Sequence, residues 1–164
     1  MMSVDSPLLD SLALEIARDG IQKIVCGAVI LHLPREGEAQ CLLLERAADD
    51  FMGGLVELPS GGVDVGEELI GALHREVLEE TGLQGQVEGY LGAFDYLSGS
   101  GKKARQLNFL MTSLEKSVRI NPAEHSQFYW LTQTDLANTE LKISVETSRI
   151  VIGGFGALDG IGRR

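Results

Sequence analysis

The sequence predicts a fold of the α/β or α+β class, arranged as an α/β/α sandwich. Segments with strand character are interspersed with amphipathic helical segments, and neighbouring strands are separated by turns short enough for hairpins. No internal repeat or linker-like stretch divides the 164 residues, a length that suits one domain. We therefore expect a single domain over residues 1–164, with an N-terminal helical extension over 1–20 and a glycine-rich, flexible tail over 153–164.

The elements follow from the apolar pattern in chain order. Residues 5–19 alternate apolar and polar residues at helical spacing, and Asp19-Gly20 ends this helix. Strands are expected over residues 24–33, 40–45, 55–58, 87–97, 105–114 and 128–131. The pattern indicates a second helix over 67–81, with Asp64 and Glu67 as a capping box and Gly82 as the C-terminal glycine. A third helix is expected over 144–152.

Composition narrows the class of partner. The formal net charge of −10 disfavours binding to a nucleic-acid polymer or an anionic membrane, because both require a basic surface. A small phosphate-bearing ligand remains compatible, because divalent cations can bridge two sets of negative charges. The sequence shows no secretory signal and no apolar run long enough to span a bilayer, so a cytoplasmic location is expected. Cys26 and Cys41 lie in apolar runs and are interpreted as buried thiols.

The helix over 67–81 places carboxylates where a core-facing stripe is expected. On a helical wheel Glu80 falls inside the apolar sector and Glu76 at its edge, with Glu79 close by; the sector is formed by Leu69, Ile70, Leu73 and Val77. Three such carboxylates repel one another, and a divalent cation would compensate for their partial burial. Ligands that are all oxygen favour Mg²⁺ or Mn²⁺ over zinc. The alternative is a solvated acidic face with local partners such as Arg75.

The spacing of these residues resembles the Nudix box. Gly61 is followed after five residues by Glu67 and after seven more by the run Arg75-Glu76-Val77-Leu78-Glu79-Glu80-Thr81-Gly82-Leu83. This pattern is similar to the box of Nudix hydrolases at every defined position. The resemblance implies a Nudix-type α/β/α sandwich with a mixed sheet, and a metal-dependent enzyme that cleaves a diphosphate linkage.

The resemblance also implies roles for individual residues. Glu76, Glu79 and Glu80 would bind the metal, together with the backbone carbonyl of Ser60, where the family commonly has glycine. Arg75 would orient a box glutamate by a charge-assisted hydrogen bond. The remaining box residues would be structural, namely Gly61, Gly62, Glu67 and Gly82.

The reaction expected of this family combines metal and acid–base catalysis. Bound cations neutralise phosphate oxygens and activate a water molecule, and a carboxylate takes the proton of that water. The carboxylate is either a box residue (Glu76 or Glu80) or Glu124, which lies in a later loop where Nudix proteins often place an acidic base or ligand. Glu124 is alternatively an ordinary loop glutamate.

Residues 45–52, joined without a gap to Glu57-Leu58-Pro59, resemble the MutT-type branch. Enzymes of that branch hydrolyse nucleoside triphosphates, oxidised guanine nucleotides among them, to monophosphate and pyrophosphate. Arg46 would then contact the base, or else be an exposed arginine at a strand end. Asn138 would read a purine edge, or else be a turn asparagine. The chain lacks the residues that mark ADP-ribose, dinucleoside polyphosphate and coenzyme A enzymes. An ADP-ribose or nucleotide-sugar pyrophosphatase and a non-catalytic nucleotide sensor remain the alternatives.

Overall fold

The structure is a computed structural model that describes residues 1–161. Its centre is a seven-stranded sheet with the order β3-β2-β1-β6-β5, in which β4 pairs with β1 and β7 pairs with β2. The strands are β1 (Lys23–His32), β2 (Gln40–Arg46), β3 (Val56–Glu57), β4 (Ser60–Gly62), β5 (Gln86–Leu97), β6 (Lys103–Ser113) and β7 (His125–Leu131). β1 and β6 run parallel, whereas the other paired strands are antiparallel.

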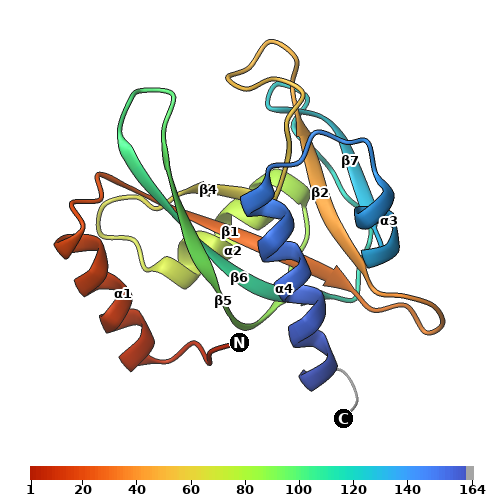
Figure 1. Ribbon diagram of the computed structural model, residues 1–164, viewed down its shortest axis with the longest axis horizontal. Helices are drawn as coiled ribbons and strands as arrows, with labels where there is room; N and C mark the ends of the chain where they lie inside the picture. The colour runs from red at the N-terminus through yellow and green to blue at the C-terminus, as the bar shows by residue number, and fades with distance from the viewer. Residues whose placement is uncertain (162–164) are drawn as a thin grey trace.

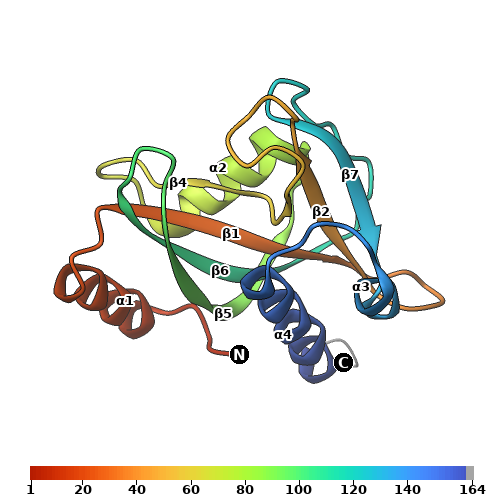
Figure 2. The same ribbon diagram turned by 45° about the horizontal axis from the view of Figure 1, so that its top comes forward.

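Helices cover both faces of this sheet. They are α1 (Ser6–Arg18), α2 (Leu69–Thr81), α3 (Gln133–Asn138) and α4 (Val145–Ile161). One apolar cluster joins α1 and α2 to the side chains of one sheet face, and a second joins α4 to the other face. Figures 1 and 2 show α2 and α4 on opposite sides of the strands. The predicted α/β/α sandwich with a mixed sheet is confirmed.

The start of α2 differs from the prediction. The helix begins at Leu69 instead of residue 67, and its N-cap residue, Glu68, makes no capping hydrogen bond through its side chain. One hydrogen bond of the predicted capping box is present, because the carboxylate of Glu67 accepts from the backbone N–H of Asp64; it also accepts from Arg75. The helix ends as predicted, because Gly82 adopts the left-handed conformation with φ of 74°.

The prediction of a flexible tail from residue 153 is wrong for the residues that the structure describes. α4 continues to Ile161, with Gly154 and Phe155 buried. A Cβ at Gly154 would lie 2.7 Å from Cγ1 of Val29, so glycine allows close contact between helix and sheet. Residues 162–164 of the expected tail lie outside the described residues.

Two elements were not predicted. Ser60–Gly62 has loop-like composition but pairs with β1 as β4, opposite Gly27, Cys26 and Val25. α3 follows a capping box of Thr132 and Asp135, in which each side chain accepts a hydrogen bond from the other residue's backbone N–H. That Thr-x-x-Asp pattern could have identified the helix start.

Candidate active site

The strand β4 and the helix α2 bring the two halves of the box into contact. The carboxylate of Glu76 packs directly on Gly61, so closely that any Cβ at residue 61 would collide with it. Arg75 also contacts both β4 and the carboxylates of this region. Its guanidinium donates to Glu67 at 2.7 and 2.8 Å, to Glu76 at 2.8 Å and to the backbone carbonyl of Gly62 at 3.1 Å. Arg75 therefore fixes both the loop and the first box carboxylate of α2.

These contacts change the proton affinities of the carboxyl groups. Hydrogen bonds from Arg75 and, to a smaller extent, from the backbone N–H of Asp64 lower the pKa of Glu67 to about 2. Burial raises the pKa of Glu76, although the hydrogen bond from Arg75 opposes this effect. Glu67 is thus a charged partner of Arg75 at neutral pH, which suits the structural role expected of it.

Of the box glutamates Glu76 and Glu80, Glu80 has the more strongly raised pKa. Its Oε2 accepts a hydrogen bond from the backbone N–H of Ser60 at 3.0 Å. Burial raises its pKa to about 9, and the charges of Glu57, Glu76 and Glu124 add to the increase. Without a cation, Glu80 therefore holds a proton at neutral pH. The burial of Glu80 agrees with the helical wheel, which places this residue in the apolar sector.

Glu79 and Glu124 complete the set of predicted ligands from more open positions. The side chain of Glu79 is 59% exposed and contacts Arg75 at 3.3 Å. Glu124 lies in the loop before β7, and possible ligand atoms of Glu80, Glu124 and His125 all lie within 4.8 Å of one another. The backbone carbonyl of Glu124 accepts a hydrogen bond from Ala47, which ties this loop to the end of β2.

The donor set fits a divalent cation. The acidic cluster consists of Glu76, Glu79, Glu80 and Glu124, which offer carboxylate oxygens and whose charges act on one another. The Ser60 backbone is bonded to Glu80, and His125, a nitrogen donor, lies beside Glu80 and Glu124. A buried carboxyl group beside several others is costly to ionise unless a cation compensates the charge. Most of these donors are hard carboxylate oxygens, which Mg²⁺ and Mn²⁺ prefer.

Sequence reasoning missed two residues beside the cluster, Glu57 and His125. Nε2 of His125 lies 3.3 Å from Oε1 of Glu57, and Arg46 donates to the same oxygen at 3.0 Å. His125 is only 3% exposed, and its Nδ1 has no hydrogen-bond partner among the described residues. The available signals were their positions in the sequence, because Glu57 lies two residues before Pro59 and His125 directly follows Glu124.

Arg46 makes a different set of contacts from those expected of a base-reading residue. Besides Glu57, its guanidinium donates to Asp50 at 3.0 Å and to the backbone carbonyl of Phe51 at 2.6 Å. Arg46 therefore holds the loop of residues 47–55 in place. Asn138 is exposed at the end of α3, where its amide donates to the carbonyl of Thr134, and the structure does not bring it to the pocket beside the cluster.

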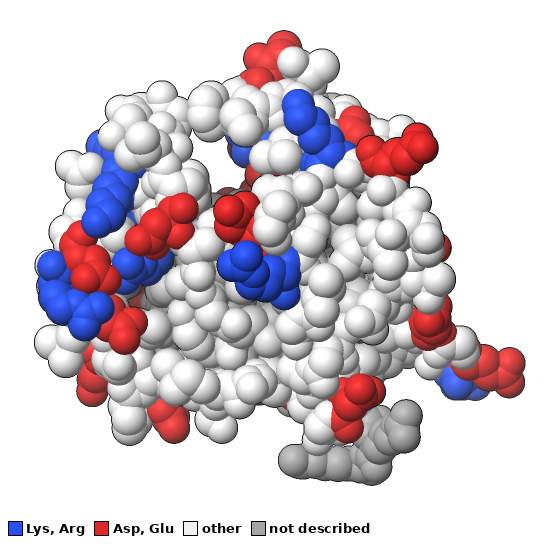
Figure 3. All heavy atoms as spheres, in the orientation of Figure 1, with Lys and Arg blue, Asp and Glu red and all other residues white. Residues whose placement is uncertain are grey.

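A pocket with a volume of about 420 Å³ opens next to the acidic cluster. Leu58, Gln106 and Thr147 are its most buried lining residues, and exposed residues of loop 47–55 and of the β5–β6 hairpin surround it. Figure 3 shows a hollow between these two segments, with acidic atoms beside it. Ser60 lines the pocket and donates a hydrogen bond to Glu80, and Glu57 lines the pocket close enough to raise the pKa of Glu80. The pocket and the acidic cluster are therefore continuous.

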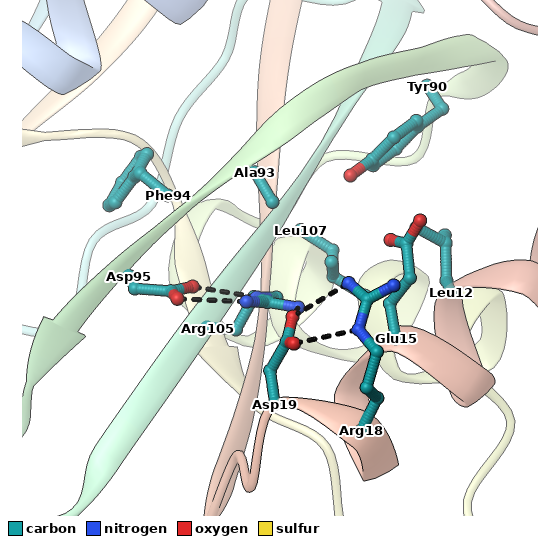
Figure 4. Close-up of a pocket in the computed structure, with 10 residues that line it drawn as sticks. All are labelled: Leu12, Glu15, Arg18, Asp19, Tyr90, Ala93, Phe94, Asp95, Arg105 and Leu107. Carbon is teal, nitrogen blue, oxygen red and sulfur yellow. Dashed lines mark hydrogen bonds and ion pairs between the residues drawn. The ribbon is translucent and has the colours of Figure 1, made fainter.

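A second pocket, of about 440 Å³, lies between α1 and strands β5 and β6. Figure 4 shows the ion pairs that border it, in which Arg105 contacts Asp95 and Asp19, and Asp19 also contacts Arg18. These contacts attach the end of α1 to the sheet. Hydrogen bonds from Arg18 and Arg105 lower the pKa of Asp19 to about 2.

The chain has a mixed-sheet sandwich and a box helix whose carboxylates lie beside a pocket. These features place it in the class of Nudix-fold proteins. Residues 26–150 match the family described as NUDIX domain, so the chain belongs to the Nudix family. Among curated proteins, it is 36% identical over 85 residues to Nudix hydrolase 17, mitochondrial, from Arabidopsis thaliana. The match covers 51% of this chain and 46% of that protein, so the chain spans about half the length of this relative.

Solved structures share the fold. A MutT Nudix hydrolase from Burkholderia pseudomallei has a TM-score of 0.62 at 24% identity, covering 80% of this chain and 96% of that one. A C. elegans Ap4A hydrolase has a TM-score of 0.71 at 22% identity, covering 85% and 99%. The Nudix domain of Shewanella oneidensis NrtR, solved with ADP ribose, has a TM-score of 0.69 at 18% identity, covering 84% and 88%. Among residues 1–161, no helix is long and apolar enough to cross a membrane.

Proposed function

We propose that the chain is a divalent-cation-dependent pyrophosphohydrolase that converts nucleoside triphosphates to monophosphate and pyrophosphate. The continuity of the acidic cluster with the adjoining pocket is the observation that carries this proposal. Phosphates bridged by cations would lie at the cluster, and the nucleoside would occupy the pocket. The pocket volume of about 420 Å³ lies in the range of small-molecule binding sites and suits a nucleoside.

The box residues would hold the cation and keep their positions through contacts within the protein. Glu76, Glu79, Glu80 and the carbonyl of Ser60 would hold Mg²⁺ or Mn²⁺, which when bound neutralises phosphate oxygens and activates water. Arg75 keeps Glu76 against Gly61, and the N–H of Ser60 orients Glu80. The site is therefore preorganised, which reduces the cost of arranging charges during the reaction.

Glu124 is the proposed general base. Its side chain is exposed at the mouth of the cluster, close enough to Glu80 to raise the pKa of that group. An exposed carboxylate can accept a proton from the attacking water and release it to solvent. Glu80 and Glu76, which are partly buried and held by backbone or Arg75 contacts, suit ligation better than proton transfer.

One observation favours the MutT-type reaction over the alternatives, namely the resemblance of the sequence from residue 45 to Pro59 to that branch. A MutT protein also shares the fold. Arg46 holds loop 47–55 at the pocket, so its effect on the base would be indirect. Other proteins of this fold are named for Ap4A hydrolysis or were solved with ADP ribose, so dinucleotide and ADP-ribose substrates belong in the test.

Product analysis tests the proposal. The protein is incubated with Mg²⁺ or Mn²⁺ and a nucleoside triphosphate, ADP-ribose, a dinucleoside polyphosphate or a nucleotide sugar, and the products are separated. We expect monophosphate and pyrophosphate from a triphosphate. Cleavage of ADP-ribose or a dinucleotide with triphosphates untouched would overturn the substrate assignment. Nucleotide binding without cleavage of any substrate would overturn the enzymatic role and leave a sensor.

A further inference from the structure

Two amide side chains lie side by side within the central sheet. Gln106 and Asn108 are two residues apart on β6, so they share one face, and they are 7% and 0% exposed. Nδ2 of Asn108 donates to the backbone carbonyls of Gly92 at 3.1 Å and Gln106 at 3.2 Å. Because carbonyls only accept, these contacts fix the orientation of the Asn108 amide and turn its Oδ1 toward Gln106.

The orientation of Gln106 follows from that of Asn108. Its Nε2 donates to Oδ1 of Asn108 at 2.8 Å. If the amide were reversed, two oxygens would face each other without a proton between them. Oε1 of Gln106 is therefore the free acceptor of the pair, and within residues 1–161 no protein group donates to it.

A glycine in the adjacent strand makes room for this pair. Gly27 of β1 is the register partner of Asn108. A Cβ at Gly27 would lie 2.5 Å from Nε2 of Gln106 and 2.6 Å from Oδ1 of Asn108. Glycine weakens the interior of a strand, and here it preserves a slot for two buried amides.

Gln106 lines the pocket beside the acidic cluster, together with charged groups of both signs. Glu57, Asp95 and Glu146 are acceptors when ionised, and the first two already accept from Arg46 and Arg105. Lys23 and several hydroxyl groups of the lining can donate. Selection at the Gln106 position therefore rests on its own free Oε1, which complements an amino group there and disfavours a carbonyl oxygen.

We propose that Gln106 determines base specificity, with its Oε1 accepting a hydrogen bond from the exocyclic amine of an adenine or cytosine nucleotide. This inference rests on the proposed function, because it places the nucleoside in this pocket. An amide matches such bases well, since it can accept from the amine while donating to the neighbouring ring nitrogen. A base with a carbonyl oxygen at that position would leave two acceptors facing each other.

The first test compares ligands on the wild-type protein and needs no substitution. Calorimetry measures the dissociation constants of AMP, IMP and the 5′-monophosphate of purine riboside, which has neither amine nor carbonyl at that position. We expect AMP to bind about 10-fold more tightly than either analogue. Equal affinities for the three ligands would overturn the inference, whatever the outcome of the hydrolysis assays.

The second test removes the acceptor. In Gln106→Met the preference for AMP over the purine riboside nucleotide should fall to near unity, whereas the matched exposed substitution Gln127→Met should retain it. Thermal unfolding checks that Gln106→Met is folded, because the change leaves Oδ1 of Asn108 without its donor. A folded Gln106→Met protein that keeps the full preference would overturn the role of Gln106. If the wild-type protein prefers AMP but releases no pyrophosphate from a nucleoside triphosphate, that result would instead count against the proposed function.

Discussion

Replacing Glu80 by Gln should change how the stability of the metal-free protein depends on pH. The pKa of Glu80 is raised from its ordinary value of 4.5 to about 9, mainly by burial. Between these values the folded protein binds a proton that the unfolded chain does not. The protonated carboxyl group therefore contributes its full stabilisation below pH 4.5, and this contribution is lost as the pH rises toward 9.

The size of this effect follows from linkage. One extra proton bound by the folded state lowers the free energy of unfolding by about 1.4 kcal/mol for each unit of rising pH. Glutamine mimics the protonated carboxyl group but cannot titrate. The stability of Glu80→Gln relative to wild type should therefore increase by about this amount per unit between about pH 6 and about pH 8.

Urea unfolding in the presence of a chelator measures the difference directly. Glu79→Gln is the matched control, because the Glu79 side chain is 59% exposed and its replacement should not change the slope. Added Mg²⁺ should stabilise wild type increasingly as the pH rises, since binding requires the deprotonated carboxylate. Parallel stability profiles for wild type and Glu80→Gln would refute the reasoning.

Three further predictions concern the base, the C-terminal helix and the attachment of α1. Glu124→Gln should lower turnover by about 10² to 10⁴ without changing the Mg²⁺ requirement; recovery at high Mg²⁺ would identify a ligand instead, and unchanged kinetics an ordinary loop residue. Gly154→Ala should destabilise the protein by about 1–3 kcal/mol in urea unfolding, because its Cβ would lie 2.7 Å from Val29. Gly156→Ala, which meets nothing within 4 Å, should stabilise it by about 0.5–1 kcal/mol; equal effects of the two changes would contradict the packing of α4. The ion pairs of Asp19 stabilise the fold above pH 3.8 and lose this effect as the pH falls toward 2, so Asp19→Asn should show a weaker dependence of stability on pH over that range. An acid-unfolding curve identical in slope to wild type would contradict this role.

The box was predictable because its signal is local. Helical spacing places Glu80 among the apolar residues of α2, and the structure has this carboxyl group largely buried beside Ser60. The glycine at residue 82 likewise marks the end of the helix through a backbone conformation that glycine adopts easily. Local periodicity and backbone conformation are properties that a sequence displays directly.

The contacts beside the box were not predictable in the same way. Arg46, Glu57 and His125 come from three different strands, and their contacts depend on how β2, β3 and β7 pair. The amide pair of Gln106 and Asn108 depends similarly on a glycine in a neighbouring strand. Pairing between distant strands is a property of the whole sheet.

The glycine-rich end of the chain was mispredicted for a related reason. Glycine weakens a helix by about 1 kcal/mol per residue in isolation, so residues 153–161 do not suggest a helix on propensity alone. Burial of Val151 and Phe155 against the sheet supplies the missing stabilisation. Tertiary packing therefore decided the structure of this segment against its local preference.

Pyrophosphate release by matched variants tests the central claim most directly. Wild type, Glu80→Gln and Glu36→Gln are compared with Mg²⁺ and a nucleoside triphosphate, where Glu36 is an exposed residue of the β1–β2 loop. Wild type and Glu36→Gln should release pyrophosphate at the same rate, and Glu80→Gln should be slower by about 10² or more. A folded Glu80→Gln protein that releases pyrophosphate at the wild-type rate would contradict the assignment of the acidic cluster as the active site.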